Sequence, residues 1–305
     1  MKTKGREKMK PFDRMFYGTG AAEGIPDPFC RCPVCENARK KGGKEIRHRT
    51  MFRVNVDLCI DLGADAASQA TVLGDFTGLH HVLYTHTHED HFCIMMLQMR
   101  DMATHRDREP LHVYLTDRAY DVLDKLHGDP TIIKGRTREL EEKGVFCFHQ
   151  LHFGEETEIA GYRVLPLKGD HIGSMGENSA NYLLTGPDGK TLYYGLDTGW
   201  YLPETLQALA GRHIDVLITE CTFGLTPGMD AHPRGHLHAF ALRELLDVLR
   251  EQGTLDETSR VYATHINHWT SNHEQLAAYF AGQDLFCPFT VAWDGMQIPQ
   301  DGPDR

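Results

Sequence analysis

The sequence predicts a large α/β or α+β domain, and two β-sheets packed face to face with helices outside would fit it. Three observations lead to this prediction. Short apolar runs that alternate with polar residues recur along the chain, as half-buried strands do. Amphipathic segments separate many of these runs, and loops rich in Gly, His and Asp end several of them. No fixed-period repeat or low-complexity linker interrupts residues 1–305, so we expect a single domain.

The predicted strands fall into two series along the chain. The first series is Arg14–Tyr17, Met51–Val56, Cys59–Asp61, His81–Tyr84, His112–Leu115 and Val145–His149. The second is Arg163–Leu167, Asn181–Thr185, Leu192–Gly195, Val216–Thr219, Val261–Thr264 and Thr290–Trp293. Between two strands of the second series, Pro187-Asp188-Gly189 predicts a turn, because proline presets φ and glycine accepts a positive φ.

Helices are predicted between the strands. They are Ala64–Leu73, Phe92–Thr104, Asp117–Leu126, Pro203–Leu209, Ala239–Gln252 and Glu274–Ala281. The first helix follows Asp61–Asp65, which has the residue types of a helix cap. Residues 101–160 hold few candidate ligands, and we expect them to form a covering or inserted region.

Composition limits the class of protein. The 305 residues are 41% hydrophobic and 25% charged, as in ordinary globular proteins. No apolar run approaches the roughly 18 residues of a membrane span, and the basic N-terminus lacks the apolar segment of a signal peptide. We therefore expect a cytoplasmic protein without a membrane partner. In that compartment the eight cysteines are expected as thiols or metal ligands rather than disulfides.

The net charge of −11 argues against a nucleic-acid partner, since such binding depends on clustered Lys and Arg. The stretches Arg39–Lys44 and Arg47–Arg53 concentrate positive charge locally. They leave RNA binding open as an alternative.

The run Tyr84–Phe92 is the most informative part of the chain. It places His86, His88, Asp90 and His91 between an apolar strand and an apolar helical stretch. Imidazoles with one carboxylate are typical ligands of zinc, manganese or iron, whereas calcium and magnesium prefer oxygen. A solvated polar loop is a poor explanation for this spacing, so we predict a metal site.

Three further ligand-type residues follow predicted strands. They are His171 after Leu165–Leu167, Asp197 after Leu192–Gly195, and His265 after Val261–Thr264. Each alone would more often be a structural turn residue. Together they extend the predicted site to four places in the chain.

These motifs, in this order from about residue 14 to residue 296, resemble the metallo-β-lactamase superfamily. The resemblance implies an αββα sandwich with its site at the edge where strands end. It also implies seven ligands shared by two divalent metals, zinc or manganese. They are His86, His88 and His171 for the first metal, Asp90, His91 and His265 for the second, and Asp197 as the bridge. A metal pair can share a hydroxide that attacks a phosphoester, so Asp90 is also assigned to catalysis.

Cys30-Arg31-Cys32-Pro33-Val34-Cys35 forms a second candidate site in what we predict to be a turn-rich segment. Three thiolates require a fourth ligand for a closed tetrahedral zinc site, and His268 is the best candidate. Redox-active or unligated cysteines are the alternative. Elsewhere, Cys59, Cys93, Cys147, Cys221 and Cys287 lie in apolar stretches and are expected as buried thiols.

The run Gly18–Pro26, the cysteine motif and the distal His265-Ile266-Asn267-His268 together resemble one subgroup of the superfamily. It is the phosphoribosyl cyclic phosphate phosphodiesterase of bacterial phosphonate breakdown. That resemblance implies one structural zinc held by three Cys and one His beside the dinuclear site. Homodimers are common in the subgroup, so a homodimer is expected here.

The segment 232–240 supplies the candidate proton donor. The resemblance assigns this role to His236, with His238 and His232 as rivals; capping or exposure is the structural alternative for each. A histidine can protonate a leaving alkoxide near neutral pH. Arg234 could also contact a phosphate.

The sequence therefore predicts a metal-dependent phosphodiesterase acting on a small cyclic or nucleotide-like phosphodiester. One alternative is a tRNA 3′-end endoribonuclease, although no long Gly-Pro-Lys-rich insertion is present to grip RNA. Another is a non-hydrolytic accessory protein of quinone-cofactor biosynthesis, which carries a comparable cysteine motif. Thioester or β-lactam hydrolysis is a third.

Overall fold

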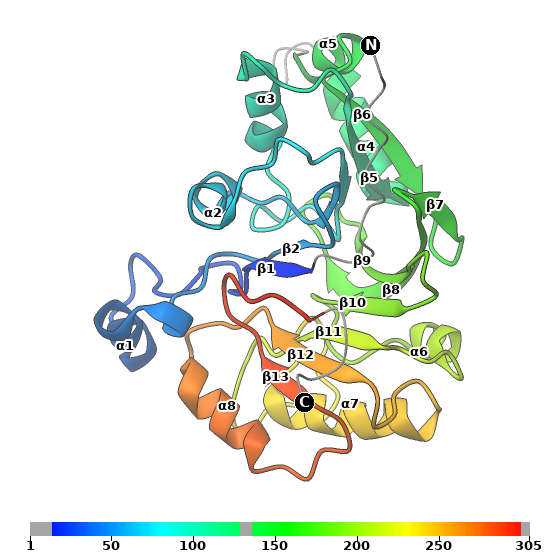
Figure 1. Ribbon diagram of the computed structural model, residues 1–305. Helices are drawn as coiled ribbons and strands as arrows, with labels where there is room; N and C mark the ends of the chain where they lie inside the picture. Colours follow the sequence, from blue (N-terminus) through cyan, green and yellow to red (C-terminus); the bar gives the residue numbers. More distant parts are fainter. Residues whose placement is uncertain (1–13, 129–135, 300–305) are drawn as a thin grey trace.

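Two mixed β-sheets pack face to face in the computed structural model, which describes residues 14–128 and 136–299 (Figure 1). The strand order is β1-β2-β3-β4-β5-β6 in the six-stranded sheet and β13-β12-β11-β10-β9-β8-β7 in the seven-stranded sheet. Helices cover the outer faces. The predicted sandwich is confirmed.

The six-stranded sheet contains the first half of the chain. Its strands are β1 Met15–Gly18, β2 Met51–Arg53, β3 Leu58–Ile60, β4 His81–Leu83, β5 Leu111–Thr116 and β6 Phe146–Leu151. Strands β3 to β6 are parallel, whereas β1, β2 and β3 pair antiparallel. Its helices are α2 Ala66–Leu73, α3 Ile94–Met102, α4 Asp117–Gly128 and α5 Arg136–Glu142. Apolar residues of these helices pack on the outer face of the sheet.

The seven-stranded sheet contains the second half. Its strands are β7 Thr157–Ile159, β8 Tyr162–Ile172, β9 Asn178–Thr185, β10 Thr191–Gly195, β11 Val216–Glu220, β12 Arg260–Thr264 and β13 Phe289–Val291. Its helices are α1 Pro33–Lys41, α6 Pro203–Leu209, α7 Ala239–Glu251 and α8 His273–Ala281, with a short 3₁₀ turn at Gly43–Glu45. Figure 1 shows α6, α7 and α8 on the side away from the first sheet. Among the described helices, none has the length and apolar character that crossing a membrane requires.

A central core joins the two sheets. Phe52 and Leu83 of the first sheet are fully buried against Tyr182, Tyr194 and Ile218 of the second. The rings of Phe52 and Tyr194 lie 5.8 Å apart. Burial of such large side chains is the main favourable contribution to folding, and it fixes how the strand ends of the two sheets meet.

The sequence prediction missed α1, α5 and the short edge strand β7. The prediction of a turn-rich segment around the cysteine motif was wrong, because residues 33–41 form helix α1. The signals were present, since Pro33 occupies the first turn and Cys32 accepts a hydrogen bond from the Cys35 N–H as a cap. We interpreted the segment by its ligands alone and overlooked its helix signals.

Residues 101–160, expected as a covering or inserted region, supply strands to both sheets. They contain β5 and β6 of the first sheet and β7, the edge strand of the second. The predicted turn at Pro187–Gly189 joins β9 to β10, and Gly189 has the expected positive φ of 80°.

Candidate metal centre

The seven predicted metal ligands come together at strand ends of the two sheets. They are His86, His88, Asp90 and His91 between β4 and α3, His171 near the end of β8, Asp197 after β10 and His265 after β12. Three groups of their ligand atoms each lie within 4.8 Å of one another: His86, His88 and His171; His86, His91 and Asp197; Asp90, His91 and His265. Because the groups share members, they form one continuous cluster.

Two halves can be distinguished by distance. In the first, His88 Nδ1 lies 2.9 Å from His86 Nε2 and 3.1 Å from His171 Nε2. In the second, Asp197 Oδ2 lies 3.2 Å from His91 Nε2 and 3.3 Å from His265 Nε2. Asp197 also shares a group with His86 of the first half, so its carboxylate borders both halves.

Neighbouring side chains determine which ring nitrogen carries the proton. Asp61 accepts from His91 Nδ1 at 2.7 Å, because a carboxylate is only an acceptor. Thr222 donates to Glu220, so it accepts from His265 Nδ1 at 2.9 Å. The Nε2 atoms of both histidines face the cluster, as in metal-binding histidines held by an outer partner.

The residues present fit a bound cation. Among the described residues, the buried atoms that make no hydrogen bond include three in this cluster: His91 Nε2, His265 Nε2 and Asp197 Oδ2. All three lie close together, with Asp197 Oδ2 3.2 Å from His91 Nε2 and 3.3 Å from His265 Nε2. Buried polar atoms without a partner are costly, and a shared metal ion would satisfy them together.

Burial sets the charge state of two ligands. It lowers the pKa of His86 well below its ordinary value and also lowers the pKa of His171, so both imidazoles stay neutral and able to bind metal. Burial opposes ionisation of Asp90, but His91 and His265 hold the pKa of Asp90 well below its usual range. Burial alone would lower the pKa of His91, but the carboxylates of Asp90, Asp197 and Asp61 raise it well above its ordinary value. A metal ion bound there would therefore displace a proton from His91.

Two of the predicted ligands and one of their partners lie on strained backbone. Asp61, Asp197 and His265 have φ values of 63°, 49° and 54°, a region that non-glycine residues rarely occupy. Each follows a strand that enters the site. Gly63 permits a further close approach, since a Cβ there would lie 1.9 Å from the Asp90 carbonyl oxygen. Such strain is typical of functional sites.

His236 borders the cluster without belonging to the metal-ligand groups named above. Its Nδ1 lies 3.0 Å from the buried Glu220 Oε2, and its ring lies 4.6 Å from that of His171. Burial alone would lower the pKa of His236, but the Glu220 carboxylate raises it to about 9. Glu220 also accepts from the Thr198 and Gly199 N–H groups, which fixes its position.

The rival histidines have other contacts. His238 Nδ1 caps α7 by accepting from the Ala241 N–H, and its Nε2 donates to the Asp230 carbonyl. His232 stacks on Trp200 at 3.7 Å, away from the cluster. Arg234, considered as a phosphate contact, instead forms two 2.8 Å hydrogen bonds to Asp170. Of the three histidines, His236 is the one that lines the cavity described next.

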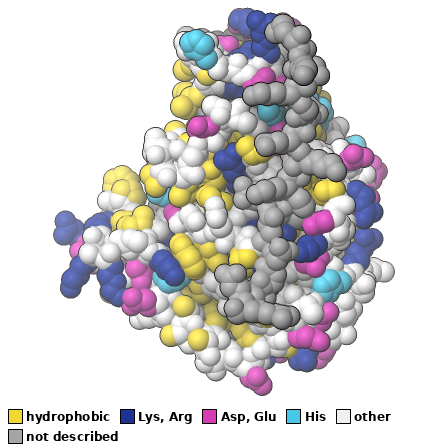
Figure 2. Space-filling model, in the orientation of Figure 1, with side chains coloured by type: hydrophobic (Ala, Val, Ile, Leu, Met, Phe, Trp, Pro, Cys, Tyr) yellow, Lys and Arg dark blue, Asp and Glu magenta, His cyan; other side chains and the backbone are white. Residues whose placement is uncertain are grey.

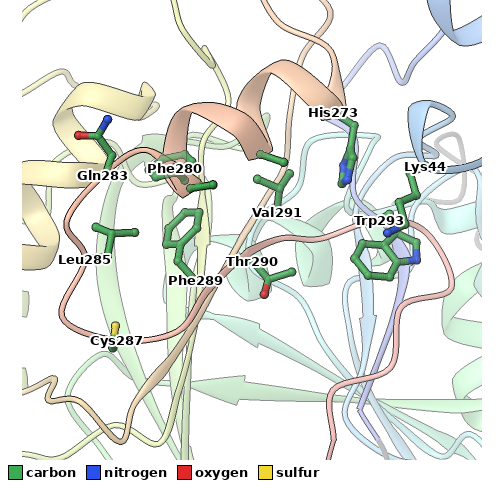
Figure 3. Close-up of a pocket in the computed structure, with 12 residues that line it drawn as sticks. Lys44, His273, Phe280, Gln283, Leu285, Cys287, Phe289, Thr290, Val291 and Trp293 are labelled. Carbon is green, nitrogen blue, oxygen red and sulfur yellow. The ribbon is translucent and has the colours of Figure 1, made fainter. Parts of the chain in front are cut away.

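The cluster opens into a cavity of about 570 Å³. His88, Asp90, His171, Asp197, His236 and His265 line its floor. Phe223 and the exposed Trp269 form an aromatic wall with ring centroids 5.1 Å apart. A second cavity of about 440 Å³ lies between α8 and β13, and Figure 3 shows Phe280, Phe289 and Trp293 around it. Its lining contains no carboxylate and none of the predicted ligands, so it is separate from the metal centre.

The cysteine motif forms a separate cluster. Sulfur and nitrogen atoms of Cys30, Cys32, Cys35 and His268 lie within 4.8 Å of one another, and Cys32 Sγ is 3.3 Å from His268 Nδ1. Burial opposes ionisation of Cys32, but hydrogen bonds from the Cys35 N–H and His268 lower its pKa to about 7. Burial raises the pKa of Cys35 to about 12. A tetrahedral metal site requires four ligands, so these four residues could hold a structural metal.

The sequence prediction missed Asp61, Thr222 and Glu220. We assigned Asp61 to a helix cap, but it binds His91 and Thr85 instead. Asp61 and Glu220 lie where β3 and β11 end, the same kind of position that indicated Asp197. A search for every acidic residue after a predicted strand would have found both.

Similar structures share this fold. A diphosphatase from the PhnP family is 19% identical with a TM-score of 0.65, covering 94% of this chain and 97% of that chain. Zinc-bound PqqB from Methylobacterium extorquens is 17% identical with a TM-score of 0.67, covering 94% and 99%. The short form of human tRNase Z is 16% identical with a TM-score of 0.59, covering 94% and 98%. At such identities the likeness shows the fold alone.

The family is shown by the sequence itself. No curated protein matches the chain significantly. The model of the β-lactamase superfamily domain matches residues 53–266, a span that includes all seven predicted ligands of the His/Asp cluster. With the two mixed sheets and the buried His/Asp cluster in place, this chain belongs to the metallo-β-lactamase superfamily.

Proposed function

We propose that this protein is a metal-dependent phosphodiesterase that hydrolyses a small cyclic or nucleotide-like phosphodiester. The observation that carries the proposal is the Asp197 carboxylate between two groups of ligands, with His236 facing the same cavity. Two adjacent divalent metals, zinc or manganese, would activate a water and neutralise the charge that develops on the phosphoryl oxygens.

The assignment of ligands follows the distances. His86, His88 and His171 would hold one metal, and Asp90, His91 and His265 the other, with Asp197 between them. Asp61 and Thr222 orient His91 and His265 by binding their Nδ1 atoms. Such outer partners typically contribute about 10–100-fold to metal affinity or activity.

His236 is proposed as the proton donor to the leaving alkoxide. Glu220 binds its Nδ1, which turns Nε2 away from Glu220 and keeps the ring beside His171. Phe223 contacts the His236 ring edge-on at 5.6 Å and limits its rotation. The Nε2 proton is thus available to a substrate oxygen bound above the His/Asp cluster.

The cavity supports a small substrate. Its volume of about 570 Å³ suits a molecule of nucleotide size, and the Phe223–Trp269 wall offers a flat surface for a sugar or base. Of the two aromatic side chains in this wall, Trp269 is the one that is largely exposed. We propose that it contacts the part of the substrate that leaves after cleavage.

The charge distribution does not favour the RNA alternative. Arg47, part of one basic stretch, is buried and bonded to Thr19 and the Ala292 carbonyl. Arg49, in the same stretch, pairs with Asp65. Figure 2 shows Lys and Arg gathered around α1, where the exposed basic residues are Arg31, Arg39, Lys40, Lys41 and Lys44. This short patch is the remaining candidate for a phosphate-backbone contact.

The test is a turnover panel on the metal-loaded protein. It sets bis(4-nitrophenyl) phosphate, a ribose 1,2-cyclic phosphate and a 2′,3′-cyclic nucleotide against a thioester and a β-lactam, with zinc and manganese in parallel. We expect turnover of a phosphodiester and none of the thioester or β-lactam. Absence of phosphodiester turnover with either metal would refute the proposal, and cleavage of precursor tRNA alone would favour the endoribonuclease.

A further inference from the structure

A third group of ligand-type side chains lies outside the His/Asp and cysteine clusters. It consists of His112 on β5 with Cys147 and His149 on β6, and its ligand atoms lie within 4.8 Å of one another. Cys147 was expected as a buried thiol. That expectation is wrong, because Cys147 is half-buried and adjoins two half-buried histidines.

Strand register brings the three residues together. Strands β5 and β6 are parallel, with His112 opposite Cys147 and Tyr114 opposite His149. Residues two apart on a strand share a face, so all of these side chains lie on one side of the sheet. Tyr114 belongs to the core between the sheets, which identifies that side as the inner face. His112 lies near the start of β5, whereas the His/Asp cluster lies beyond the end of β4.

The ring nitrogens of the two histidines already face each other at hydrogen-bond distance. His112 Nδ1 lies 2.8 Å from His149 Nε2. The corresponding distances among the first group of predicted metal ligands are 2.9 and 3.1 Å. Among the described residues, no ion pair joins His112 or His149 to a carboxylate. A thiol adjoining two facing imidazole nitrogens completes a three-ligand set.

Aromatic contacts hold both rings in place. His112 stacks on His81 with centroids 5.0 Å apart and planes 16° apart. His149 stacks on Tyr114 at 4.7 Å and 19°. Tyr114 and His81 are themselves linked by a 3.1 Å hydrogen bond between the hydroxyl and Nδ1. The rings therefore lose little freedom if they bind an ion, which favours binding.

We propose that His112, Cys147 and His149 bind a divalent zinc ion, separate from the two proposed metal sites. Two imidazoles and one thiolate suit zinc, with a water molecule as the fourth ligand. Binding releases the Cys147 thiol proton to solvent, since the thiolate is the ligand. The ion would link β5 to β6, the edge strand of the first sheet, through side chains as well as backbone.

The experiment counts zinc in four full-length proteins. Wild type, Cys147→Ser, His149→Ala and the control Cys287→Ser are loaded with zinc, desalted and analysed by mass spectrometry. We expect Cys147→Ser and His149→Ala each to hold one zinc fewer per chain than wild type and Cys287→Ser. Equal zinc content in all four proteins would overturn the proposal.

A crystallographic measurement covers the case in which a variant fails to fold. Zinc-loaded wild-type crystals are measured above and below the zinc absorption edge. An anomalous peak between His112 Nδ1, His149 Nε2 and Cys147 Sγ is expected. A peak at the His/Asp cluster with none at this position would refute the third site while leaving the proposed function intact. The reverse pattern would support the third site and count against the proposed function.

Discussion

The His/Asp cluster and the cysteine cluster differ in the kind of atom they offer and in their access to solvent. The first presents imidazoles and carboxylates to a cavity of about 570 Å³. The second gathers three sulfurs and one imidazole around the start of α1, and none of its four residues lines that cavity. In zinc proteins, sites that keep one coordination position open for water or substrate are typically catalytic, whereas sites closed by four protein ligands are typically structural.

The same contrast appears in the supporting residues. Polar side chains such as Asp61 and Thr222 hold the histidines of the His/Asp cluster. The cysteine cluster relies on backbone N–H groups that donate to Cys30 and Cys32 sulfurs at 3.4 Å. The comparison teaches that one site is built to orient a reacting group and the other to join distant segments. Four substitutions test this difference, from the largest effect on turnover to the smallest.

Asp197→Ala should abolish phosphodiester turnover and lower the content of the catalytic metals. The substitution removes the carboxylate between both groups and leaves His91 and His265 without their shared partner. Turnover and metal content are measured beside Asp188→Ala, a control in the β9–β10 turn. Full activity in Asp197→Ala would contradict the assignment of the bridge.

His236→Asn should lower kcat by about 100-fold or more, the usual contribution of a general acid. Its metal content should match wild type, because His236 is not one of the proposed ligands. His232→Asn, in the same loop, is the control and should keep wild-type kcat. A substrate with an activated aryl leaving group should be affected less than an alkyl one. Equal losses for both leaving groups would rule out proton donation.

Asp61→Asn should weaken metal binding by about 10–100-fold, since the amide no longer holds His91 Nδ1 through a charge. Added metal should restore most of the lost kcat, which distinguishes a positioning role from a chemical one. Activity is measured against free metal concentration beside Asp75→Asn, a surface control. A metal-independent loss of kcat would show that Asp61 acts in another way.

Cys32→Ser should have the smallest effect on turnover and a large effect on stability. We expect the loss of one zinc per chain and a decrease of about 4 kcal/mol in the free energy of unfolding. Folded protein should keep wild-type kcat. Unchanged zinc content would refute the structural zinc site. A loss of kcat in protein that remains folded would show that the cysteine cluster also serves catalysis, contrary to the difference proposed between the two clusters.

The metal centre could be predicted from the sequence where its chemistry is local. His86 to His91 lie within one loop, and His171, Asp197 and His265 each follow an apolar run that forms a strand. Asp61 and Glu220 could not be assigned roles this way, because their roles depend on contacts with His91 and His236 across the fold. The strand pattern was predictable for the same local reason.

The cluster of His112, Cys147 and His149 shows most clearly what could not be predicted from the sequence. His112 and His149 are 37 residues apart, and no spacing in the sequence links them. Their contact depends on the pairing of β5 with β6, which only the register reveals. Helix α1 is the opposite case, since Pro33 and Glu36 were adequate local signals that the cysteines beside them obscured.

The most direct test of the central claim is hydrolysis of bis(4-nitrophenyl) phosphate by metal-stripped protein during reconstitution with zinc or manganese. The account predicts no activity after chelation and a rise that reaches its plateau when two catalytic metals are bound per chain. Phosphodiester cleavage that persists in the metal-free protein would contradict it, as would a fully reconstituted protein that cleaves only a thioester or a β-lactam.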